Sequence, residues 1–175
     1  METTASIHIR LAAPADAELL ADLGARTLRA TFGPDKSEAQ AAYLALTFSP
    51  EAKSGDLADP QAIVLIAEVH DSAAAYARLR FGYSPPGVGG GAPMEIARFY
   101  ADAPWVGRGV GKTLMESCLD IARDKGCDVV WLDVWEKNLR AIAFYAKWGF
   151  KVVGSQALGW ETMSKTMVGK AREER

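Results

Sequence analysis

The feature that most constrains this chain is a glycine-rich segment at residues 107–112, which has the sequence Gly-Arg-Gly-Val-Gly-Lys. It separates a strand-like stretch, 94–101, from a helix-like stretch, 112–125. Glycines at such a junction allow the backbone to turn tightly and to aim successive N–H groups at one point, and the following helix adds the positive end of its dipole. The segment therefore predicts a site for an anion such as phosphate.

Two nucleotide-binding folds use a similar loop, but the position of this one in the chain disfavours both. With Thr113 the segment matches the end of the P-loop pattern G-x-x-x-x-G-K-[ST], and 129–133 resembles a strand ending in a magnesium-binding aspartate. However, Val106 occupies the first glycine position, and only residues 114–175 remain to build a parallel sheet. The dinucleotide fingerprint G-x-G-x-x-G has a different spacing and also opens a long βαβ array.

Hydrophobic periodicity predicts a mixed α/β order along the chain. The predicted strands are 7–11, 62–69, 74–81, 94–101, 128–135, 150–154 and 161–168, and the predicted helices are 14–28, 36–48, 49–57, 112–125 and 139–148. A chain of 175 residues suits one domain that buries about 70% of its unfolded surface. We expect a single domain over 1–175, with an ordered core at 5–170 and a charged tail at 171–175.

Composition excludes several classes of function. A net charge of −2 and a pI near 5.7 provide no basic field for nucleic acid or for an acidic membrane. Cys118 and Cys127 form no C-x-x-C pair and His8 and His70 are remote from each other, so we expect neither a metal site nor a disulfide. The N-terminus lacks signal-peptide features and the apolar run 62–67 is too short to span a bilayer, so we expect a cytoplasmic protein.

The second half of the chain resembles the GCN5-related N-acetyltransferase (GNAT) superfamily. The resemblance rests on the strand 95–101, on Pro104-Trp105, on the glycine loop, and on Asn138-x-x-Ala141-x-x-Phe144-Tyr145-x-x-x-Gly149-Phe150. The pattern departs from the family at Val106, where Gln or Arg is usual. More weakly, residues 27–32, 49–51 and 134–138 are similar to the polyamine-acetylating branch. The resemblance implies a mixed, mostly antiparallel sheet of about seven strands, flanked by helices and splayed between the fourth and fifth strands.

The resemblance also implies acetyl-CoA as co-substrate, with its pyrophosphate on the glycine loop and its pantetheine arm along the strand before it. No metal is implied, because the thioester is already activated. The implied cofactor-binding residues are Phe99, Tyr100, Ala101, Gly107, Arg108, Gly109, Val110, Gly111, Lys112 and Asn138.

Tyr145 corresponds to the tyrosine that family members place beside the cofactor sulfur, where it would protonate the departing thiolate. Packing of its helix onto the sheet is the alternative role. An amine with a pKa of about 10 must also lose a proton before it attacks. Glu95 and Asp133 each match a catalytic carboxylate of different relatives. We favour Glu95, and Asp133 or water stays open.

The sequence constrains the identity of the acceptor less than that of the cofactor. Carboxylates at Glu68, Glu95, Asp133 and Glu136 and aromatic rings at Tyr83, Trp105, Trp131 and Trp135 are residue types that attract a cationic amine. We expect a small polyamine-like amine, acetylated by direct attack in a ternary complex. The alternatives are a protein N-terminus or lysine, or an acetyl-CoA sensor or scaffold without turnover. Pairing into a homodimer is left open.

Overall fold

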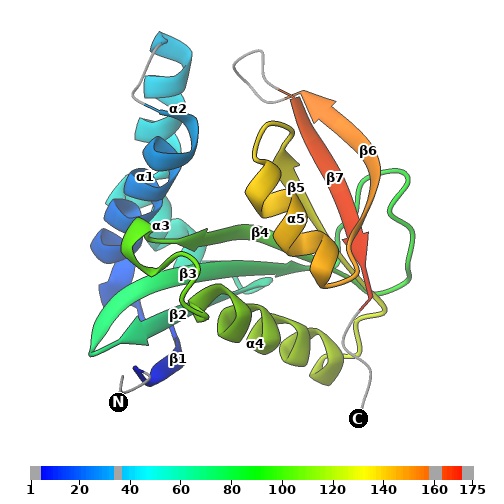
Figure 1. The fold of residues 1–175 in the computed structure, drawn as a ribbon, viewed down its shortest axis with the longest axis horizontal. Helices are drawn as coiled ribbons and strands as arrows, with labels where there is room; N and C mark the ends of the chain where they lie inside the picture. Colours follow the sequence, from blue (N-terminus) through cyan, green and yellow to red (C-terminus); the bar gives the residue numbers. More distant parts are fainter. Residues whose placement is uncertain (1–4, 34–36, 158–162, 171–175) are drawn as a thin grey trace. The chain divides into compact units, whose positions relative to one another are not determined.

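The computed structural model describes residues 5–33, 37–157 and 163–170, and Figure 1 follows the chain through its elements. The helices are α1 (Ala17–Phe32), α2 (Glu38–Thr47), α3 (Pro50–Ala58), α4 (Val110–Asp124) and α5 (Leu139–Lys147), with 3-10 turns η1 (Pro14–Asp16) and η2 (Ala103–Trp105). The strands are β1 (Ile7–Leu11), β2 (Ala62–Val69), β3 (Ser72–Phe81), β4 (Pro93–Ala101), β5 (Val129–Trp135), β6 (Lys151–Ala157) and β7 (Met163–Gly169). The predicted tail 171–175 and the predicted strand residues 161–162 lie outside the described residues.

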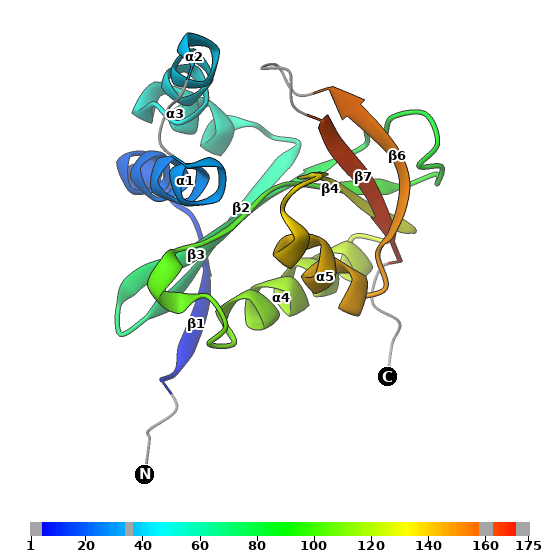
Figure 2. The same ribbon diagram turned by 45° about the horizontal axis from the view of Figure 1, so that its top comes forward.

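The seven strands form one sheet in the order β1-β2-β3-β4-β5-β7-β6. β4 pairs with β5 in parallel, whereas β1 with β2, β5 with β7, and β6 with β7 pair in antiparallel fashion. The β6–β7 pair is visible in Figure 2. The predicted mixed, mostly antiparallel sheet is therefore confirmed.

The parallel pair β4–β5 has a short register. Three residues of each strand are partners, Pro93–Glu95 with Val129–Trp131, although β4 continues to Ala101 and β5 to Trp135. A sheet partner normally satisfies the backbone N–H and C=O groups of a strand. Pairing that ends at Glu95 agrees with the predicted splay between the fourth and fifth strands.

Contacts divide the chain into two compact units, one of residues 1–78 with 98–117 and one of residues 79–97 with 118–175. In the first unit α1 turns Leu20, Leu23 and Leu28 inward at helical spacing, and they pack against β2, β3, α2 and α3. Ser37 and Ser49 begin α2 and α3 as N-caps, since their side chains accept from Gln40 N and Ala52 N at 3.1 Å. No helix within the described ranges is both long and apolar enough to cross a membrane.

In the second unit, β5 is the most buried strand. Val130, Leu132 and Val134 point to one face, and Val129 and Trp131 start the strand in a cluster with Val88 of the 84–92 loop. The Asp128 carboxylate holds that loop by accepting from Gly91 N at 2.8 Å and Ala92 N at 3.0 Å. The loop is thus anchored at the N-terminal end of β5, six residues from Trp135.

Candidate active site

The glycine loop lies in the first unit and has the geometry that an anion site needs. Gly107 and Gly109 have φ values of 77° and 85°, in the left-handed region that side chains disfavour. α4 begins at Val110, two residues earlier than predicted, so Gly111 and Lys112 belong to its first turn, where backbone N–H groups have no partner within the helix. Val110 is buried and anchors this turn, while Arg108 and Lys112 are exposed. An anion here would meet two cations and the N–H groups of the first turn of α4, which have no partner within the helix.

The loop is tied to the rest of its unit through Asp102. The Asp102 backbone N–H donates to Ala74 O at 2.8 Å, and its side chain accepts from Ala103 N at 3.1 Å and caps η2. Arg26 of α1 donates to Asp102 Oδ2 at 2.9 Å. The sequence prediction missed Arg26, because nothing in a helical pattern indicates a partner 76 residues away.

The end of β4 has two different faces. Side chains alternate along a strand, so Tyr100 points away from Phe99 and Ala101. Tyr100 packs edge-on against Tyr76, with ring centroids 5.5 Å apart, and against Phe48 at 6.0 Å, and burial raises its pKa. The Tyr100 ring is thus part of the core of its unit, whereas Phe99 and Ala101 point to the other face of β4.

Two predicted carboxylates share one face of the second unit. Glu95 is the direct partner of Trp131 in the parallel register, and Asp133 follows two residues along β5, so both side chains point the same way. Glu95 forms an ion pair with Arg80 of β3, with Nε and Oε2 3.0 Å apart, and its side chain is 16% exposed. The structure therefore brings the two candidate bases onto a common surface but gives Glu95 a cationic partner.

Asp133 has neutral partners instead. Thr166 Oγ1 of β7 donates to Asp133 Oδ1 at 2.6 Å, and Gln156 Nε2 of β6 lies 3.2 Å from Oδ2. The residue is solvent-accessible, but neighbouring protein desolvates its carboxyl and raises the pKa, while the Thr166 hydrogen bond acts in the opposite direction. A raised pKa with open access is the combination that a general base needs.

Asn138 and Tyr145 lie on one helix, as the spacing predicted. Asn138 Oδ1 caps α5 by accepting from Ala141 N at 3.2 Å. The Tyr145 side chain is 7% exposed, and its ring packs against Phe144 and Phe150 with centroids 5.5 and 5.9 Å apart. Tyr145 therefore fills a packing position, and a catalytic role would depend on its phenol group.

Several residues expected to attract an amine have structural partners. Trp131 is 2% exposed, and its Nε1 donates to Tyr83 O at 2.9 Å, so it is a core residue. Glu68 accepts from Arg10 Nε at 2.7 Å. Trp135, on the same strand face as Asp133, is half-buried, and Glu136 is exposed. Of the predicted set, Asp133 and the nearby Trp135 and Glu136 are therefore the residues best placed to contact a cationic amine.

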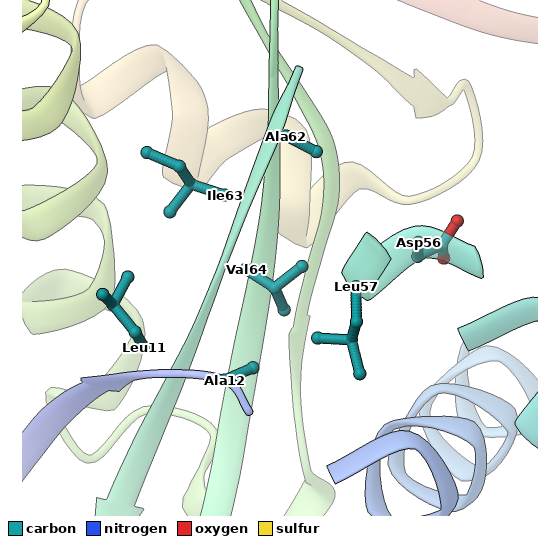
Figure 3. A pocket seen from close by; sticks show the side chains of 7 residues that line it. All are labelled: Leu11, Ala12, Asp56, Leu57, Ala62, Ile63 and Val64. Atoms are coloured by element: carbon teal, nitrogen blue, oxygen red, sulfur yellow. The ribbon is translucent and has the colours of Figure 1, made fainter. Parts of the chain in front are cut away.

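Other reactive groups provide no competing site. Cys118 is fully buried in α4, and burial raises its thiol pKa, which suppresses the nucleophilic thiolate. A pocket of about 220 Å³ lies in the first unit, lined by Leu11, Ala12, Asp56, Leu57, Ala62, Ile63 and Val64 (Figure 3). None of these is a predicted site residue. Across the described ranges, no group of three or more His, Cys, Asp or Glu is placed to hold a metal ion.

Comparison with known proteins agrees with this geometry. The model of the acetyltransferase (GNAT) family matches residues 21–150. An uncharacterised N-acetyltransferase of Mycobacterium bovis is 33% identical over 142 residues, which cover 81% of this chain and 86% of the relative. The spermine/spermidine N(1)-acetyltransferase of Bacillus subtilis is 31% identical over 60 residues, 34% of this chain and 40% of the relative.

Solved structures give the same fold. The PaiA N-acetyltransferase of Thermoplasma acidophilum, in complex with coenzyme A, superposes with a TM-score of 0.77 at 22% identity and covers 94% of this chain and 99% of its own. The family match spans the glycine loop, Glu95, Asn138 and Tyr145. On this evidence the chain belongs to the GNAT family of acetyltransferases and uses acetyl-CoA as its acetyl donor.

Proposed function

We propose that this protein transfers an acetyl group from acetyl-CoA to a primary amine of a small, polyamine-like molecule, by direct attack in a ternary complex. The observation that carries the proposal is the solvent-accessible carboxylate of Asp133, which has neutral hydrogen-bond partners and lies on the same face of β5 as the half-buried Trp135. Negative charge and an aromatic ring favour a cationic acceptor. The B. subtilis relative, whose name gives spermine and spermidine as its acceptors, supports the same substrate class.

The residues of the glycine loop fit the pyrophosphate of acetyl-CoA. Gly107 and Gly109 have exposed, positive-φ backbone, the N–H groups in the first turn of α4 have no partner within the helix, and Arg108 and Lys112 are exposed cations. The bound cofactor supplies an activated thioester, so the remaining work is to deprotonate the amine and to protonate the thiolate. In our proposal the backbone of Phe99 and Ala101 binds the arm, and Tyr145 Oη donates the proton to the leaving sulfur.

We assign the general base to Asp133. Its desolvated carboxyl has a raised pKa and accepts hydrogen bonds from neutral donors, whereas Glu95 is engaged in an ion pair with Arg80. A carboxyl closer in pKa to neutral pH is a better base. Glu95, which the sequence favoured, is the alternative that experiment must exclude.

Two measurements test the function. Calorimetry should detect acetyl-CoA binding that weakens in the Arg108→Ala/Lys112→Ala double variant and not in Lys151→Ala, a control at an exposed lysine of β6. A thiol-release assay should then show turnover with spermidine, spermine and diamines, and much less with peptide N-termini or lysine peptides. Tight acetyl-CoA binding without thiol release on any amine would instead support a sensor or scaffold.

The base is tested by comparing Asp133→Asn with Glu95→Gln. We expect Asp133→Asn to remove the acid limb of the pH profile of kcat/KM for the amine, and Glu95→Gln to leave its midpoint in place. The opposite pattern would transfer the role to Glu95, and two unchanged profiles would indicate water.

Location and assembly belong to the same proposal. Cys118 and Cys127 are free thiols, in keeping with the cytoplasmic location that we expect. A homodimer is the assembly to check, by analytical ultracentrifugation at micromolar concentration.

A further inference from the structure

Three polar side chains from three neighbouring strands, Asp133, Thr166 and Gln156, contact one another. In the β5–β7 register Asp133 is directly opposite Thr166, and Thr166 Oγ1 donates to Asp133 Oδ1 at 2.6 Å. Gln156 Nε2 of β6 lies 3.2 Å from Asp133 Oδ2, 3.4 Å from Oδ1 and 3.4 Å from Thr166 Oγ1. Both carboxylate oxygens therefore accept hydrogen bonds from side chains of the neighbouring strands.

The arrangement leaves the carboxylate accessible while its closest donor, Thr166, is buried. Thr166 is 4% exposed, whereas Asp133 is solvent-accessible. At a buried strand position a valine would fill nearly the same volume as threonine without a hydroxyl to satisfy. The hydroxyl at Thr166 thus has a specific use, which is the short hydrogen bond to Asp133.

Neutral donors orient a carboxylate without cancelling its charge. An ion pair, such as that of Glu95 with Arg80 on the same face, would compete with a cationic acceptor for the carboxylate. Thr166 and Gln156 carry no charge, so the negative charge of Asp133 stays available to an ammonium group.

The other charged side chains nearby do not contact this carboxylate in the described residues. Lys165 of β7 is the partner of Val134 and points to the opposite face. Lys151 of β6 is the partner of Val168, at the far end of the β6–β7 pair. Glu136 and Lys137 follow the end of β5 and are exposed.

We propose that Thr166 and Gln156 are positioning residues, which hold the Asp133 carboxylate in one orientation so that it can take a proton from the acceptor amine. The inference rests on the proposed role of Asp133 as general base. In the step concerned, an ammonium N–H proton passes to a carboxylate oxygen of Asp133, the nitrogen keeps the electron pair, and the carboxylic acid later releases the proton to water.

Thr166→Val tests the hydrogen bond, with Thr166→Ser as the matched variant that keeps a hydroxyl. Loss of a donor to the ionised form should raise the titration midpoint of Asp133 by roughly one pH unit, a tenfold change in proton affinity. Carbon NMR of the Asp133 side-chain carboxyl measures that midpoint without any turnover. The acid limb of the kcat/KM profile for the amine should move in the same direction by the same amount, with the KM for acetyl-CoA unchanged.

Gln156→Leu provides a second perturbation at an exposed residue, which should fold even if the buried Thr166→Val variant does not. We expect a smaller shift of the same sign, because its hydrogen bonds are longer.

Three results would overturn the inference, and only the last of them would also overturn the proposed function. An unchanged Asp133 midpoint in both variants means that the donors do not control the carboxylate. A shifted midpoint with an unshifted kcat/KM profile means that they do not act in the reaction; in both cases amine-dependent turnover survives. If wild-type protein releases no thiol with any amine, the proposed function fails together with the inference.

Discussion

Gly24, in the middle of α1, predicts a clear loss of stability when a single methyl group is added. An ideal Cβ at this position would lie 2.5 Å from Phe48 Cε1 and 2.7 Å from Tyr76 Oη, closer than real Cβ contacts. Phe48 is 6% exposed and Tyr76 is 1% exposed, so neither ring can move into solvent. Gly24→Ala therefore forces the core that supports the end of β4 to shift.

The size of the effect comes from two opposing contributions. Overpacking a tight core costs about 1–3 kcal/mol, and close approach to two buried rings places this site near the upper end. Alanine in a helix interior is favoured over glycine by about 1 kcal/mol. The net loss should be about 2 kcal/mol, which for a domain of this length lowers Tm by about 4–8 °C.

Gly55 provides the matched control. It lies inside α3, and an ideal Cβ there has no atom within 4 Å, so Gly55→Ala should gain the helix-propensity benefit alone and raise Tm by about 2–4 °C. Thermal unfolding followed by circular dichroism measures both variants. A Gly24→Ala protein as stable as wild type would refute the packing argument. A destabilised Gly55→Ala protein would show that the gain in helix propensity does not offset the cost of overpacking as assumed.

Three further predictions concern other parts of the molecule. Tyr145→Phe should lower kcat at least tenfold and leave acetyl-CoA affinity within about twofold, measured by thiol release and calorimetry; unchanged kcat would leave Tyr145 a packing residue only. Hydrogen bonds from Arg10 hold the pKa of Asp16 below its ordinary value. The pair therefore stabilises the fold above a pH of about 4, and this stabilisation is lost as the pH falls. In urea titrations, the difference in unfolding free energy between wild type and Asp16→Asn should shrink from pH 7 to pH 3. Burial raises the thiol pKa of Cys118, which is buried, and of Cys127, which is half-buried. Iodoacetamide at pH 7 should therefore alkylate Cys127 slowly in the native protein and Cys118 only after unfolding, as followed by mass spectrometry. Rapid labelling of Cys118 would contradict its burial.

Much of this protein follows from local sequence pattern. The order of strands and helices and the glycine loop before α4 depend on residues close together in the chain. Periodicity, capping and glycine placement are local rules, so they predict these features well. The spacing of Asn138 and Tyr145 is equally local, because both lie on one helix.

The partners of the candidate catalytic groups were decided only by the tertiary structure. Glu95 was the favoured base from sequence, yet strand pairing gives it Arg80, and it gives Asp133 the hydroxyl of Thr166 from 33 residues away. Trp131 was a candidate for binding an amine, and the loop at Tyr83 covers it. An alternating pattern specifies which residues share a face of their own strand, but it does not specify the neighbouring strand or its register. The charge state and accessibility of a carboxylate depend on those neighbours, which is why the sequence identified the candidates and only the fold supplied their partners.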